Sequence, residues 1–156
     1  MSEGRFDRYV VAALRFGART VLFQEAAARR LDLSVTQLEC FQMVRHEGPL
    51  TAADLARETG LTQASLSVII DKLVAREFLS REQDRADRRR WILEAKLAAI
   101  VRVDAVYAAH ARRTARLLEG FSEEEFDAAL RFMDRLAEEL KLTAIELGQT
   151  SPSNSD

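Results

Sequence analysis

The 156-residue chain has few of the residues that support disulfide, metal or membrane chemistry. Its single cysteine, Cys40, excludes an intrachain disulfide and is typical of a reducing compartment. The two histidines, His46 and His110, do not have metal-ligand spacing with the acidic residues, so we expect no metal site and no cofactor. No stretch approaches the roughly 18 consecutive apolar residues of a membrane span, and the N-terminus resembles no targeting signal. We therefore expect a cytoplasmic protein without a membrane partner.

The two signs of charge are concentrated in different parts of the chain. The formal net charge is only −2, which by itself argues mildly against nucleic-acid binding. Arginines nevertheless concentrate between residues 76 and 90, whereas acidic residues dominate between 119 and 146. Such a separation can place a cationic face on an acidic protein.

Helix start and stop signals divide most of the chain into helices. Three segments have capping-box spacing, which satisfies free amides at a helix N-terminus: Ser34–Gln37, Thr51–Asp54 and Ser122–Glu125. Glycine, alone or followed by proline, ends two of the helices. The predicted helices cover about 5–30, 34–47, 51–59, 62–76, 95–118 and 123–147, and 78–93 is typical of a hairpin with an exposed tip. The expected fold is mainly α with a small β-hairpin, followed by a disordered polar tail at 149–156.

The two central helices predict a helix-turn-helix. Their apolar residues are spaced to share one small core around a turn at Gly60, which would let the second helix enter a DNA major groove. The outward face of that helix is small and polar, so its backbone can approach base edges closely. The candidate DNA contacts on it are Gln63, Ser65, Ser67, Val68 and Lys72. Periodicity alone is equally consistent with an amphipathic helix that presents a solvated face.

Residues 33–93 resemble the MarR family of winged helix-turn-helix transcriptional regulators. The resemblance rests on an Asp-basic-Leu triplet at 71–73, a strand ending in arginine at 78–81, and an Asp-x-x-Asp-x-Arg signature at 84–89. The segments 33–37 and 50–56 match the places where the family begins its second helix and its helix-turn-helix. The chain departs from the family in three places. It has Arg76-Glu77-Phe78 between the recognition helix and the wing, where glycine is common, and Val68 where a basic residue is common. After the wing it has residues 94–97 in place of the usual Thr-x-x-Gly.

The resemblance implies a wing whose arginines reach a DNA minor groove beside the recognition helix. The candidates are Arg85, Arg88 and Arg89, and Asp87 would pair with Arg89 to brace the turn. The competing interpretation of this charged run is a solvated loop. The resemblance further implies one domain over 1–148, with a winged helix-turn-helix lobe at 33–93 and dimerisation helices at 5–31 and 95–147. A self-contained monomeric bundle is the alternative to that homodimer.

The family also implies regulation by a small aromatic or phenolic effector bound between the dimerisation helices and the DNA-binding lobe. Arg15, Phe16 and His46 are candidates for its pocket. A second hypothesis makes Cys40 an oxidisable sensor, although its place beside core positions favours a buried, inert thiol.

These features predict a homodimeric transcriptional repressor that binds double-stranded DNA at a palindromic operator and is released by a ligand. The alternative is a winged helix that contacts only other proteins. We do not expect an enzyme, because no nucleophile with a base, catalytic carboxylate pair or metal motif is apparent.

Overall fold

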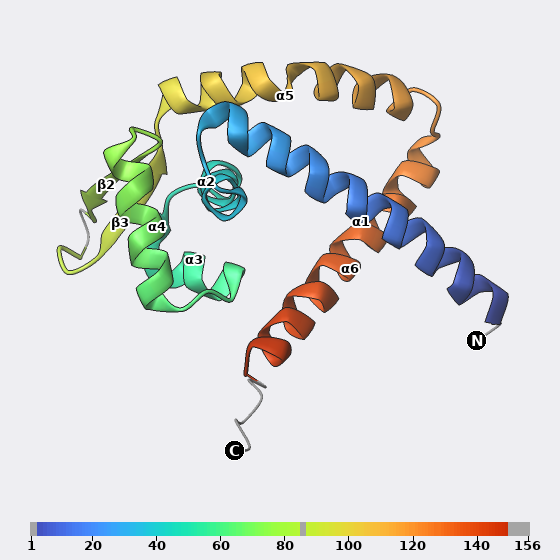
Figure 1. Ribbon diagram of the computed structural model, residues 1–156, viewed down its shortest axis with the longest axis horizontal. Helices are drawn as coiled ribbons and strands as arrows, with labels where there is room; N and C mark the ends of the chain where they lie inside the picture. Colours follow the sequence, from blue (N-terminus) through green and yellow to red (C-terminus); the bar gives the residue numbers. More distant parts are fainter. Residues whose placement is uncertain (1–2, 85–86, 150–156) are drawn as a thin grey trace.

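The computed structural model describes residues 3–84 and 87–149 and is mainly helical (Figure 1). The helices within these ranges are α1 (Glu3–Leu31), α2 (Val35–Glu47), α3 (Ala52–Thr59), α4 (Gln63–Ala75), α5 (Leu97–Leu118) and α6 (Glu123–Gln149). The strands are β1 (Leu50–Thr51), β2 (Leu79–Gln83) and β3 (Trp91–Ala95). The mainly helical fold with a β-hairpin wing is confirmed. None of the described helices is long and apolar enough to cross a membrane.

The capping residues set the helix boundaries as the sequence predicts. Ser34 and Thr51 each make a complete capping box, and the Ser122 hydroxyl accepts from the Glu125 amide while the Glu125 carboxylate accepts from the Ser122 amide. Gly60 ends α3 in the left-handed conformation, with φ +69°. The Thr62 hydroxyl then accepts from the Ser65 amide at the start of α4. Local sequence therefore accounts for the whole helix-turn-helix outline.

Two predicted boundaries are wrong. The fifth helix begins at Leu97, not at Ala95, because β3 continues to Ala95, which pairs with Leu79. The last helix continues to Gln149, although the sequence predicts that the disordered tail begins at this residue. The remainder of that tail, 150–156, lies outside the described residues.

The hairpin is part of a three-stranded antiparallel sheet in the order β1-β3-β2. Arg81 lies opposite Leu93 and Gln83 lies opposite Trp91. In a sheet, residues that pair across two strands share a face, and so do alternate residues along one strand. Leu79 and Leu93 are buried on one face of the hairpin. Towards the tip, the same face carries Arg81, Gln83 and Trp91. The wing is therefore anchored in the core at its base and exposed towards its tip.

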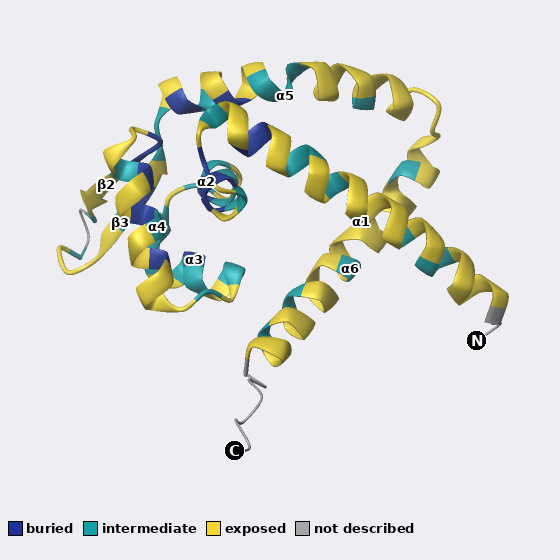
Figure 2. Ribbon diagram, viewed as in Figure 1, coloured by how far each residue is buried: buried dark blue, intermediate teal, exposed yellow. Residues whose placement is uncertain are grey.

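The core lies between α2, α3, α4 and the sheet, where the buried residues in Figure 2 concentrate. Phe41 of α2 meets Phe78 edge-on with ring centroids 5.5 Å apart, in the T-shaped arrangement that aromatic pairs favour. The other large, fully buried side chains around this pair are Leu38, Leu55, Leu66, Leu73, Leu79 and Leu93. Ala27, Ala28, Ala99 and Val103 connect α1 and α5 to this core.

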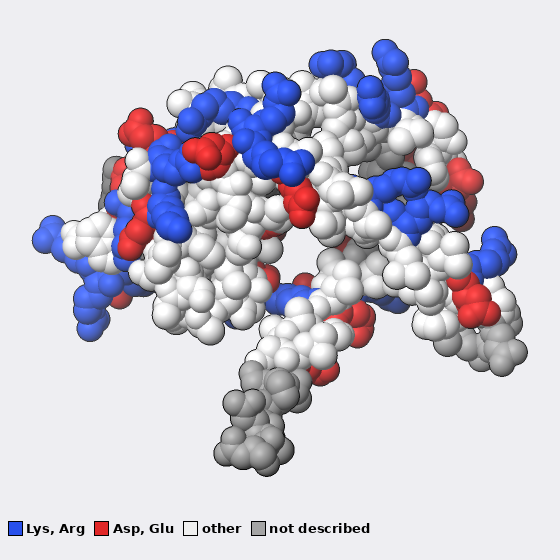
Figure 3. All heavy atoms as spheres, viewed as in Figure 1, with Lys and Arg blue, Asp and Glu red and all other residues white. Residues whose placement is uncertain are grey.

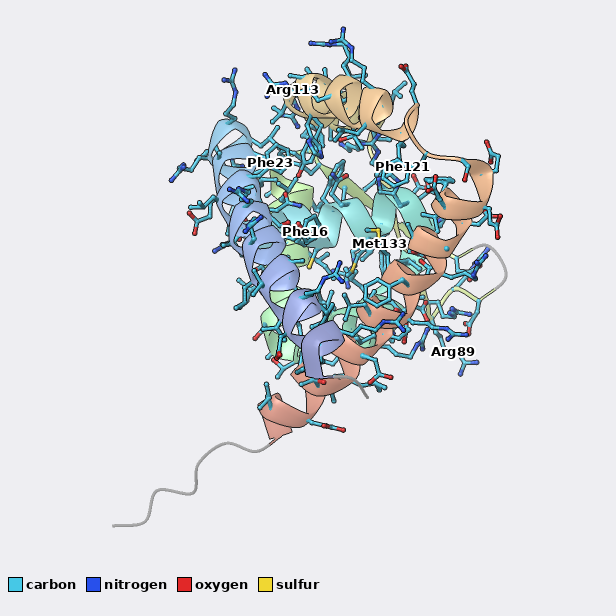
Figure 4. The ribbon with its side chains drawn as sticks, turned by 90° about the vertical axis from the view of Figure 1, so that its right-hand side faces the viewer. Phe16, Phe23, Arg89, Arg113, Phe121 and Met133 are labelled. Atoms are coloured by element: carbon cyan, nitrogen blue, oxygen red, sulfur yellow. The ribbon has the colours of Figure 1, made fainter. Side chains whose placement is uncertain are left out.

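Outside this lobe, α1, α5 and α6 form an open frame (Figures 1 and 4). The ring of Phe23 meets that of Tyr107 at 5.3 Å where α1 passes α5, and Tyr9 meets Phe132 at 5.9 Å where α1 passes α6. An open, largely apolar pocket of about 520 Å³ lies at the second crossing. It is lined by Arg5, Phe6, Tyr9, Phe132, Arg135, Leu136 and Glu139.

Candidate nucleic-acid interface

Helix α4 presents one buried face and one exposed face. Leu66, Ile70 and Leu73 are buried in the lobe. The five sequence-predicted contacts all lie on the exposed part of the helix: Gln63, Ser65, Ser67, Val68 and Lys72. Val68 is 54% exposed although it is apolar, so it is available for contact with an apolar group such as a thymine methyl. Ser65 has a second role that the sequence did not predict, because its hydroxyl accepts a hydrogen bond from the capping hydroxyl of Thr62.

The wing tip carries exposed arginines on a turn organised by Asp87. The Asp87 carboxylate accepts from the Arg89 backbone amide at 3.0 Å and lies 3.4 Å from the Arg89 Nε. Arg88 is exposed, and the Arg89 side chain is 94% exposed and projects from the wing in Figure 4. Arg85 lies outside the described residues. Figure 3 shows basic side chains at this end of the molecule.

The junction between α4 and the wing is a tight turn that contains a strained glutamate. The Phe78 amide donates to the Leu73 carbonyl and the Glu77 amide to the Val74 carbonyl, which is a Schellman motif. Glu77 has φ +61°, in the left-handed region that favours glycine. The Lys96 ammonium donates to its carboxylate at 2.8 Å, and this hydrogen bond lowers the pKa of Glu77.

A second junction connects the wing to the side of α4. Arg81 Nη1 lies 3.8 Å from Asp71 Oδ1 on α4, and the Arg81 guanidinium lies over the Trp91 ring, 5.4 Å from its centroid. Neither Arg81 nor Trp91 is among the interface residues that the sequence predicts. The alternation of side chains along two paired strands could have indicated their shared face, but only the fold places that face beside α4.

The predicted effector residues are exposed. Arg15 and Phe16 lie midway along α1, and His46 lies in the last turn of α2. None of the three lines the pocket between α1 and α6. Their role stays a prediction.

Cys40 is fully buried in α2. Burial, together with the neighbouring Glu39 carboxylate, raises the pKa of its thiol to about 11. Because the thiolate is the reactive form, this environment disfavours oxidation at neutral pH.

Comparison with known proteins agrees with this geometry. The family profile described as the MarR family matches residues 22–90. The uncharacterized HTH-type transcriptional regulator YcgE of Bacillus subtilis is 32% identical over 138 residues, which cover 88% of this chain and 90% of YcgE. The chain belongs to the MarR family. It is accordingly a winged-helix transcriptional regulator, and the expectation that it is not an enzyme is confirmed.

A further relative and two solved structures extend the comparison. The HTH-type transcriptional repressor NicR of Pseudomonas putida is 30% identical over 89 residues, covering 56% of this chain and 54% of NicR. A crystal structure of a MepR mutant from S. aureus superposes with a TM-score of 0.71 at 18% identity, covering 85% and 96% of the two chains. The crystal structure of FabT of Streptococcus pneumoniae in complex with DNA superposes with a TM-score of 0.65 at 17% identity. The match covers 88% of this chain and 96% of the FabT chain. These two structures support the fold of this MarR-family chain.

Proposed function

We propose that this MarR-family protein is a homodimeric repressor that binds a palindromic DNA operator through α4 and the wing. The observation that carries the proposal is the exposed face of α4 lying beside a wing with exposed arginines. Gln63 can hydrogen-bond adenine in a major groove, whereas Arg88 and Arg89 suit the negative potential of a narrow minor groove. The repressor NicR and the DNA-bound FabT provide parallel support.

Dimerisation is supported by apolar side chains that the single chain leaves exposed. On α1, Leu14 and Phe16 are exposed by 70% and 67%, and on α6 Met133 and Leu140 are exposed by 56% and 63%. Phe16 and Met133 lie on the sides of their helices that face the opening of the frame (Figure 4). Exposed apolar area of this extent favours burial against a partner, and a second copy would also supply the second recognition helix for a palindrome.

A small aromatic or phenolic effector is supported by polar groups where α1, α2 and α5 meet. The Tyr107 hydroxyl donates to Gln24 Oε1 at 2.5 Å and also has a hydrogen bond with the Gln42 side chain, whose Oε1 is buried without a partner among the described residues. The rings of Phe23 and His110 lie beside this cluster, with centroids 4.7 Å apart. A phenol would offer a donor to the unpaired oxygen and a ring to the aromatic side chains. Binding that favours one spacing of the two recognition helices would then change operator affinity.

Selection from a random duplex library with the purified protein tests the DNA-binding proposal. The expected result is a palindrome whose half-site centres are about one helical turn apart. Failure to enrich any sequence at low salt without added ligand would contradict it and favour the alternative, a winged helix that contacts proteins. Addition of phenolic compounds to the bound complex then tests release, and a complex unaffected by all of them would contradict the effector proposal alone.

A further inference from the structure

DNA bound as proposed above must cross the surface between α4 and the wing. A helix in the major groove and a wing tip in the adjacent minor groove stand on opposite sides of one sugar-phosphate strand. That strand therefore passes over the residues between them. Here these residues are Asp71, Arg81 and Trp91, which we call the inter-groove surface.

Arg81 has the geometry of a prepared phosphate ligand. Its separation of 3.8 Å from Asp71 is too long for a hydrogen bond, so the ion pair restrains the guanidinium without using its N–H donors. Its position over the Trp91 ring restrains it further through a cation–π contact. The side chain is still 43% exposed. A planar guanidinium held in this way can donate two parallel hydrogen bonds to a phosphate.

Trp91 supports the same interpretation. It is the only tryptophan in the chain and is 44% exposed, on a strand whose inner neighbour Leu93 is buried. The Arg81 guanidinium lies over its ring, 5.4 Å from the centroid, and this cation–π contact restrains the positive charge beside α4. The Asp71 carboxylate repels a phosphate. Arg81 is therefore the residue of the inter-groove surface that can attract the DNA backbone.

We infer that Arg81, held between Trp91 and Asp71, is a DNA phosphate contact between the recognition helix and the wing. This inference rests on the proposed DNA-binding function. A phosphate contact carries no sequence information, so Arg81 contributes equally to every duplex. Base preference stays with α4 and the wing tip.

The test titrates fluorescent duplexes with wild type and Arg81→Gln across a range of salt concentrations. One phosphate contact contributes about 0.9 to the slope of log affinity against log salt. Arg81→Gln should therefore reduce the magnitude of the slope by about one and weaken operator and unrelated DNA alike, by about tenfold at low salt. Trp91 emission should change when DNA binds to wild type.

Arg102→Gln is the matched control. Arg102 also lies over an aromatic ring, that of Phe78, at 4.4 Å, but it belongs to α5. This variant should keep the wild-type slope, and thermal unfolding is used to check that both variants are folded. Arg81→Lys retains the charge and should recover most of the slope, which a purely structural role for the stacked guanidinium would not produce.

The outcomes separate the two proposals. If wild type binds DNA but Arg81→Gln keeps its salt slope, the phosphate contact is overturned and the repressor proposal stands. A selective loss of operator preference, with unchanged binding to unrelated duplexes, would also overturn it. If wild type binds no duplex, the proposed function fails and this inference fails with it.

Discussion

Arg76, at the end of α4, donates to both the backbone carbonyl and the carboxylate of Asp32, at the end of α1. Each residue stands where a helix terminates: Arg76 is the C-cap of α4, and Asp32 has φ +55° just after α1. A guanidinium is favourable beside two helix C-termini because their unpaired carbonyls carry partial negative charge. The contact joins α4, the helix proposed to enter the major groove, to α1, a helix proposed for dimerisation.

Replacing Arg76 by Ala should therefore lower the free energy of unfolding, by about 0.5–1 kcal/mol after allowance for the exposure of both side chains. Asp32→Asn should cost less, because the backbone carbonyl still accepts from Arg76. Denaturant unfolding measures both values. Arg30→Ala removes another exposed arginine near the same helix end, and an equal loss in that variant would show that the Asp32 contact is not the cause.

Glu77 should prefer glycine. A left-handed backbone costs an L residue about 1 kcal/mol that glycine does not incur. Glu77→Gly should be neutral to stabilising even though it removes the contact with Lys96, whereas Glu77→Ala should be destabilising because it removes the contact and keeps the strain. Thermal unfolding of the pair isolates the backbone contribution. An alanine variant as stable as the glycine variant would contradict the strain interpretation.

Replacing Arg88 and Arg89 by Ala should weaken DNA binding by about 1–3 kcal/mol for each good contact. The oligomeric state should not change, because the wing is remote from α1 and α6. Anisotropy titration at moderate salt and analytical ultracentrifugation measure the two effects. The matched control replaces Arg112 and Arg113, two exposed neighbours on α5. Unchanged affinity in the wing variant would remove these arginines from the mechanism.

Cys40 should be inert to mild oxidation. Its pKa of about 11 leaves little thiolate at neutral pH, and the side chain is fully buried. Peroxide should affect operator binding equally in wild type and in Cys40→Ser, and thiol labelling should require unfolding. Weakening of the wild type alone would revive the redox-sensor hypothesis.

The helix-turn-helix should lose stability in acid through Asp54. Hydrogen bonds from Thr51, followed by contact with Arg57, lower the pKa of Asp54 from 3.8 to about 2. Because the folded pKa is depressed, this contribution is present above about pH 4 and is lost as the pH falls towards 2. Asp54→Asn should flatten that part of the stability–pH curve. A curve identical to that of wild type would contradict the assignment.

The elements of this MarR-family chain were predictable where their signals are local. Ser34, Thr51 and Ser122 mark helix starts because a capping side chain bonds within three residues. Strand β1 is not predictable locally, because its two residues pair with β3, far along the sequence, and Thr51 also has the signature of a helix cap. Such non-local pairing leaves no periodic trace in a short segment.

The candidate site divides in the same way. The exposed face of α4 follows from helical periodicity, so Gln63 and Val68 were found. The position of Arg81 over Trp91 depends on strand register, and its distance from Asp71 depends on how α4 packs on the sheet. The spacing of these residues in the sequence predicts neither contact, so both could be identified only from the structure.

The C-terminal part of α6 packs beside the helix-turn-helix. Lys141 donates to Glu58 of α3 at 2.7 Å, and a Cβ placed on Gly60 would stand 3.2 Å from Ile145 Cγ1. For protein engineering this makes the two ends of the chain unequal. A fluorescent protein or affinity tag fused soon after Gln149 would stand close to the helix-turn-helix, whereas one placed before α1 would leave that turn undisturbed. Reporter fusions for operator-binding assays therefore belong at the N-terminal side.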